Sequence, residues 1–149
     1  MRITRLAVFA TLALAVGLFA GFGPGLQAGT VAPANPLKPL SERDMASTRE
    51  MGCTCAFSTR RATFIQVIGN EFMLRTASGR AVCRITDRQF SALSGGRGTI
   101  ACGGKQLTLR PTGGVVSHEE SDSASGPAAL TVSQRGRSQV MRGDWGCAC

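Results

Sequence analysis

The residues of this chain best suited to chemistry are its six cysteines. Two Cys-x-Cys motifs stand at 53–55 and 147–149, and two single cysteines lie between them. Thiols at such positions form disulfides, bind soft metal ions as thiolates, or exchange electrons with other thiols. Which of these applies depends on the compartment in which the protein works. The six residues are Cys53, Cys55, Cys83, Cys102, Cys147 and Cys149.

Residues 1–28 predict a signal peptide and therefore an oxidising compartment. Two arginines precede an apolar run over residues 6–22, and a Gly-Pro step interrupts it before the small residue Ala28, after which we place cleavage. The alternative is an uncleaved membrane anchor, which the glycines within the run disfavour. After cleavage, no stable membrane span is expected. An even number of cysteines behind such a leader is typical of a disulfide-stapled periplasmic or secreted protein.

The charge of the chain favours an anionic partner. Without residues 1–28 the chain keeps fifteen basic and nine acidic residues, which gives a net charge of +6. Such an excess suits an anionic component of the cell envelope or an acidic protein surface. Nucleic acid is not expected as a partner, and the composition does not fix an oligomeric state.

Residues 29–50 are interpreted as a Pro-rich and polar linker. Pro33, Pro36 and Pro39 interrupt a segment that has no hydrophobic period, so this segment is expected to bury little and to be extended or mobile. Residues 51–149 remain for a single disulfide-stapled domain.

Turn signals and alternating apolar residues predict an antiparallel meander at the start of this domain. A two-residue turn at 69–70 sets Val67 opposite Phe72 and Ile65 opposite Leu74, which puts all four on one face. A second turn at Ser78-Gly79 sets Leu74 opposite Cys83 and Phe72 opposite Ile85. The third strand then adds to the same face, so Cys83 is expected to point into the core.

A short helix and another hairpin follow. Thr86 and Gln89 have the spacing of a capping box, and Gly95-Gly96 ends the helix. The turn at 103–104 then pairs Ile100 with Leu107, and it places Cys102 on their inward side. The two middle cysteines are therefore predicted to form a Cys83–Cys102 disulfide, worth about 3 kcal/mol in the chain-entropy model.

The carboxyl-terminal part is less clear. Residues 113–127 are expected to form a long surface loop, and strands resume at Ala129 around a turn at 135–136. A two-residue turn there opposes Leu130 to Met141, whereas a three-residue turn opposes Val132 to Val140. The register stays open.

The two terminal Cys-x-Cys motifs share the period of strands. Antiparallel pairing of the first and last strands places Phe57 beside Trp145, and it predicts Cys53–Cys149 and Cys55–Cys147 disulfides. A small domain of this kind needs covalent staples because its core is limited. The predicted fold is mainly β, a small antiparallel β-barrel or sandwich with one short helix, held by disulfides.

Three other uses of chemically active residues remain as alternatives. The Cys-x-Cys motifs would suit a thiolate site for Zn²⁺ or Cu⁺, or a labile redox pair, although one intervening residue is fewer than zinc sites usually have. His118 stands among Glu119, Glu120 and Asp122, where a solvated acidic loop explains the composition as well as a cation site does. We predict no cofactor, metal or catalytic residue, because this lone histidine lacks a nucleophile or paired carboxylates at a suitable spacing.

The outward side of the meander is the predicted contact surface. It carries Arg75 and Arg84 beside Phe64 and Met73, a mixture of charge and apolar area. We expect an exported, non-catalytic binding or structural module of the cell envelope. In size and compartment it is similar to small exported β domains that inhibit lytic enzymes or proteases, although no motif matches residue by residue. The alternative is a redox or metal-handling protein that uses the Cys-x-Cys motifs.

Overall fold

A computed structural model of the chain describes residues 35–48 and 50–149. The predicted signal peptide and the first residues of the predicted linker lie outside this part. Among the described residues, no helix has the length and apolar character needed to cross a membrane.

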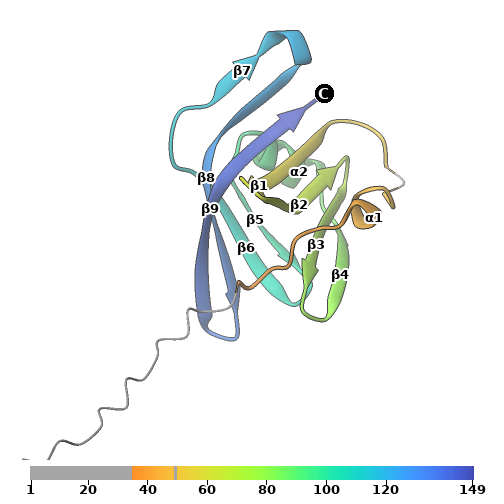
Figure 1. Cartoon of the computed structure of the whole chain (residues 1–149), viewed down its shortest axis with the longest axis vertical. Helices are drawn as coiled ribbons and strands as arrows, with labels where there is room; N and C mark the ends of the chain where they lie inside the picture. Colours follow the sequence, from red (N-terminus) through yellow and green to blue (C-terminus); the bar gives the residue numbers. More distant parts are fainter. Residues whose placement is uncertain (1–34, 49) are drawn as a thin grey trace, which may run out of the picture. The chain divides into compact units, whose positions relative to one another are not determined.

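The described chain forms a nearly closed antiparallel barrel with two short helices (Figure 1). Eight strands follow one another in the order β4-β3-β2-β1-β9-β8-β6-β5, and the short β7 pairs with β8 outside this path. The predicted mainly β fold is therefore confirmed, and of the two predicted architectures, barrel or sandwich, the chain forms a barrel; one helix was expected, and the described residues form two. The elements are α1 (Glu42–Met45), β1 (Thr54–Thr59), β2 (Ala62–Ile68), β3 (Glu71–Thr76), β4 (Gly79–Arg84), α2 (Asp87–Ser94), β5 (Gly98–Cys102), β6 (Lys105–Pro111), β7 (Val116–His118), β8 (Ser123–Gln134) and β9 (Arg137–Ala148), with a 3₁₀ turn at Glu119–Ser121.

The first predicted hairpin has the expected register. Val67 pairs with Phe72 and Ile65 with Leu74. The second turn is one residue earlier than predicted, because Phe72 rather than Leu74 lies opposite Cys83. The Thr76 side chain explains this position, since its Oγ1 accepts from the Ser78 backbone N–H at 3.2 Å and so holds the turn. A shift of two residues in pairing keeps every side chain on its predicted face.

The helix α2 has the predicted capping box. The Thr86 hydroxyl accepts from the Gln89 backbone N–H at 3.2 Å, and the Gln89 side chain accepts from the Thr86 backbone N–H at 2.9 Å. Gly95 is the C-cap, as expected. Leu93, on the inward side of α2, is buried in the core. The helix is therefore anchored by both its cap and its apolar side.

The carboxyl-terminal hairpin settles the open register. Arg135 and Gly136 form a two-residue turn with φ angles of 50° and 75°, and Leu130 pairs with Met141. Such positive φ values suit the right-handed twist of a tight hairpin. The expectation of a loop over 113–127 was wrong for most of its length, because β7 spans Val116–His118 and β8 already begins at Ser123, where it pairs with both β7 and β9.

Three disulfides join the strands as predicted. Cys53–Cys149 and Cys55–Cys147 connect the start of β1 with the end of β9, with Cα–Cα distances of 4.2 and 4.0 Å. Cys83–Cys102 connects β4 with β5, with a Cα–Cα distance of 5.8 Å. Since β4 and β5 are the two ends of the strand order, this third bond joins the seam at which the barrel is not closed by a strand ladder.

The described part of the predicted linker, residues 35–48, packs on the barrel instead of being extended and mobile. Leu37 is 1% exposed and belongs to the hydrophobic core. The Lys38 backbone N–H donates to the Arg75 carbonyl, and the Leu40 backbone N–H donates to the Thr63 carbonyl, both at 2.8 Å. These carbonyls are available because the pairing of β2 with β3 ends before it reaches them. We call residues 35–48 the strap.

Candidate functional site

All six cysteines lie in the described part of the chain and are joined in disulfides. In this state no sulfur is available as a thiolate ligand or nucleophile. His118 is exposed on β7, and the three acidic residues next to it are exposed as well. Within residues 35–48 and 50–149, no group of three or more histidine, cysteine or acidic side chains is placed to hold a metal ion. The residues that first suggested chemistry therefore serve architecture in this structure.

The predicted contact surface is not an open face of the barrel. Phe64 and Met73 are only 6% and 2% exposed. Arg75 Nη1 lies 2.6 Å from a carboxylate oxygen of Asp44 in the strap, and Arg84 Nη1 lies 2.7 Å from a carboxylate oxygen of Glu50. The two apolar residues are therefore not exposed as predicted: Phe64, at a β-bulge of β2, belongs to the hydrophobic core, whereas Arg84 remains exposed. The segment before β1 supplies the acidic partners of both arginines.

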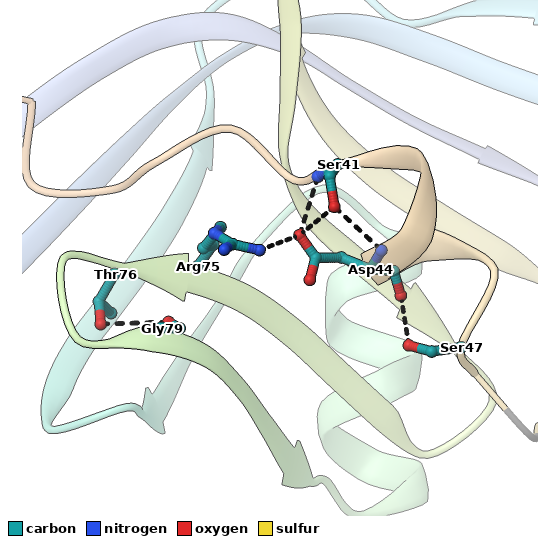
Figure 2. Close-up of polar contacts among 6 residues, drawn as sticks. All are labelled: Ser41, Asp44, Ser47, Arg75, Thr76 and Gly79. Atoms are coloured by element: carbon teal, nitrogen blue, oxygen red, sulfur yellow. Dashed lines mark hydrogen bonds and ion pairs between the residues drawn. The ribbon is translucent and has the colours of Figure 1, made fainter.

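The ion pair of the strap is part of a small hydrogen-bond network (Figure 2). Asp44 Oδ2 accepts from the Ser41 backbone N–H at 2.9 Å and from the Ser41 hydroxyl at 2.7 Å. These bonds, and then the nearby Arg75 guanidinium, stabilise the charged carboxylate and lower the pKa of Asp44 to about 2, although burial opposes the shift. At neutral pH the carboxylate is ionised, and it fixes the strap on β3.

An open groove of about 550 Å³ lies on the outer side of β5 and β6, next to α2. Its walls include Arg97 and Arg110, and beside them Thr99 and Thr108, which are paired with each other two residues away from the arginine of each strand. Both arginines are exposed, and neither forms an ion pair with any residue that the structure describes. The two threonine hydroxyls hydrogen-bond to each other at 3.1 Å, so one of their two protons remains to be donated to a ligand. The groove thus combines two available guanidinium groups with two hydroxyl groups.

The positive charge continues across the neighbouring strands. The ladder pairs Arg110 with Ala129, and Ala129 in turn with Arg142, so the two arginines lie on the same outer face two strands apart. Neighbouring strands are about 4.8 Å apart, so the backbones at Arg110 and Arg142 are about 10 Å apart across the sheet. Arg142 is also exposed. We call Arg97, Arg110 and Arg142, with the threonines of the groove, the basic face.

A smaller pocket of about 160 Å³ adjoins the groove, since Pro111 lines both. It lies between the end of α2, at Gly95 and Gly96, and the sheet formed by β8 and β9. Trp145 Nε1 donates to the Leu93 carbonyl at 2.7 Å, which satisfies its only polar atom. The remaining atoms of the indole are carbon, so Trp145 presents an apolar wall to this pocket.

Two further lining residues of this pocket come from the region of β7 and β8. Ala124, from the first part of β8, lines it together with Val115, from the loop before β7. Val115 is 62% exposed, which leaves an apolar side chain at the rim of the pocket. The pocket therefore needs β7 and the early part of β8, the region that the sequence analysis assigned to a loop.

Part of this site was within reach of sequence reasoning. The predicted pairing of Ile100 with Leu107 places Arg97 opposite Arg110 when it is extended by three residues. The alternation that turned Ile100 and Leu107 inward also turned Thr99 and Thr108 outward. The register of this hairpin therefore carries the signal for the two arginines and two threonines of the groove. The pocket had no such signal, because Gly, Ser and Ala residues give no apolar alternation.

Comparisons with family models, curated proteins and solved structures found no match to this chain. The functional interpretation therefore rests on the geometry and charge of the basic face and of the adjoining pocket.

Proposed function

We propose that this protein is an exported, non-catalytic binding module that holds an anionic group on its basic face. The observation that carries this proposal is the pair Arg97 and Arg110, which are exposed and lack an ion pair among the described residues while sharing one groove with two hydroxyl groups. Guanidinium groups bind carboxylates and phosphates through two parallel hydrogen bonds, and the threonine pair adds one further O–H donor. The groove is therefore suited to an oxyanion.

Export to the periplasm or beyond is the second part of the proposal. Three disulfides are compatible with an oxidising compartment outside the cytoplasm, where such bonds persist. The candidate ligands there are an anionic component of the envelope and an acidic protein surface. Binding to the second would make the protein inhibitor-like, in the sense that it occupies the surface of a partner without doing chemistry on it.

The experiment compares two double variants that carry the same net charge. Arg97→Gln with Arg110→Gln removes the groove cations, whereas Arg80→Gln with Arg135→Gln removes two exposed arginines outside the groove. Binding of each variant to poly-L-glutamate and to vesicles containing phosphatidylglycerol is measured at low and at physiological salt, because salt screens nonspecific attraction. The two probes distinguish an acidic polypeptide from an anionic lipid surface.

We expect the groove variant to lose about tenfold or more in affinity and the control variant to lose about threefold or less. An equal loss in both variants would show that net charge alone attracts the probes, and it would overturn the assignment of the site. Binding of neither probe by the native protein would also count against the proposal.

A further inference from the structure

One edge of the sheet beside the groove carries no strand. β5 begins at Gly98, which pairs with Leu109, whereas β6 continues to Pro111. Beyond a short loop, β7 pairs with β8 on one side only. On the side away from β8, Arg110, Pro111 and Val116–His118 therefore pair with no strand that the structure describes, whereas residues 112–115 between them form a loop and Pro111 has no N–H to donate. An exposed strand edge presents unpaired backbone groups, and it can accept a further strand from another chain.

The groove and the pocket adjoin this free edge on opposite faces of the sheet. Thr108 and Arg110 point outward into the groove, whereas Ala124 lies on the inward face with the buried Ala128. A strand added at the edge would turn successive side chains to the two faces alternately. Neighbouring side chains of such a strand would therefore reach the arginines and the apolar pocket in turn.

The volume of the pocket limits what can enter it. Sites that enclose a drug-sized ligand usually measure about 300–1,000 Å³, and this pocket has about 160 Å³. That space suits one leucine- or phenylalanine-sized side chain, and it is too small for the acyl chains of a lipid. Apolar anchors of this size in a pocket, with a polar rim, are typical of protein recognition.

We propose that the partner is an extended segment of another protein in which acidic and apolar residues alternate. The segment pairs as an additional strand with the β6–β7 edge, places one apolar side chain in the pocket at Trp145, and sets a carboxylate on Arg97 and Arg110. This inference rests on the proposed function, because the carboxylate occupies the same groove. It adds the chemical class of the ligand, its conformation and a second contact.

The experiment uses Trp145 as the reporter, since it is the only tryptophan of the chain. The probe is a blocked nonapeptide, Thr-Glu-Leu-Glu-Leu-Glu-Leu-Glu-Thr, added to the full mature protein. One matched peptide replaces every leucine by serine, and a second replaces every glutamate by glutamine. Two further peptides carry N-methyl groups on every second backbone amide, one peptide on the odd-numbered residues and the other on the even-numbered residues. Vesicles containing phosphatidylglycerol test a lipid surface as the partner.

We expect the probe to change the emission of Trp145 and to bind roughly tenfold more tightly than the serine peptide, because one apolar side chain is buried. The peptide with N-methyl groups on the amides that face β6 and β7 should bind much more weakly, whereas the peptide with the other set methylated should not, since only every second amide of a strand faces its neighbour.

The variant Val115→Asn should remove most of the tighter binding that the leucine peptide shows over the serine peptide. Val82→Asn, at an exposed valine of β4, should leave it unchanged.

Ala124→Phe tests the same point by filling the pocket, and it should abolish the emission change while binding of poly-L-glutamate persists. If the leucine and serine peptides bind equally and Trp145 does not respond, the strand and pocket are wrong while the basic face stands. If both N-methylated peptides bind alike, strand addition is wrong. Tight binding of the vesicles without binding of the peptide would assign the face to lipid. If neither acidic peptides nor vesicles bind, the proposed function fails as well.

Discussion

At Asp44 a single carboxylate connects the strap with the barrel. It closes the capping box of α1 with Ser41 and pairs with Arg75 at 2.6 Å. Each partner favours the ionised form, which is why the pKa of this group falls to about 2 from an ordinary value of 3.8. Because folding lowers the pKa of Asp44, its ionised carboxylate stabilises the folded protein at pH values above 3.8. This stabilisation is lost as the pH falls toward 2 and the carboxylate is protonated.

The replacement Asp44→Asn should therefore destabilise the protein at pH 7, by about 1–2 kcal/mol, through loss of the cap and of the charged hydrogen bonds. The difference from the native protein should shrink as the pH falls from 4 toward 2, because native Asp44 is then protonated too. Urea unfolding of both proteins between pH 2 and pH 7 measures this difference in the free energy of unfolding. Glu42→Gln is the control, since Glu42 is an exposed acid of the same helix. A difference that does not depend on pH would contradict this role of the carboxylate.

At the scale of elements, the hairpins were predictable where a tight turn and alternating apolar residues agreed. The 69–70 turn and the 103–104 turn gave the observed registers, because Gly residues with positive φ set the turn and buried side chains fixed the faces. The terminal strands were predictable from the Cys-x-Cys motifs, because the spacing of the cysteines has the two-residue period of a strand. In each case a local signal and the burial pattern pointed to one arrangement.

Two elements were missed for physical reasons. The strap has no hydrophobic period, and Leu37 is buried only because a space in the barrel accepts it, which is a tertiary effect. The spacing of Ser41 and Asp44 did carry a capping signal, but α1 has only four residues. The β7–β8 ladder sets residues 116–118 against Ser123, Ala124 and Ser125, and this part of β8 also pairs with β9, so backbone ladders rather than alternating apolar side chains define these strands.

The disulfides between elements should differ in their effect on stability. Replacing both Cys83 and Cys102 by alanine should cost about 3 kcal/mol and increase hydrogen exchange in β4 and β5, since this bond joins the seam of the barrel. Replacing both Cys53 and Cys149 should cost about 1 kcal/mol or less, because Cys55–Cys147 already closes nearly the same loop. Denaturant unfolding measures the loss of stability in each of the two double variants. Equal costs would contradict the seam role.

At the scale of the whole molecule, the covalent state separates the proposed function from the redox or metal-handling alternative. A binding module that uses its sulfur atoms for architecture should be purified with all six cysteines in disulfides, as they are in the structure. Intact mass spectrometry of the exported protein, with and without reduction and thiol labelling, should show the loss of residues 1–28 and no labelled thiol before reduction. Free thiols at the terminal motifs, or a bound metal ion, would favour the alternative.

The bonds that tie β1 to β9 make the domain a covalent ring from residue 53 to residue 149. A protease that cuts the exposed stretch between β6 and β7 would therefore open the ring without releasing a fragment, and both pieces would stay attached through two bridges. Such a cut would fall outside the β1–β9 ladder, which the two bridges join. One cleavage there would leave the two pieces joined, and it would cut only the edge proposed to pair with the partner segment.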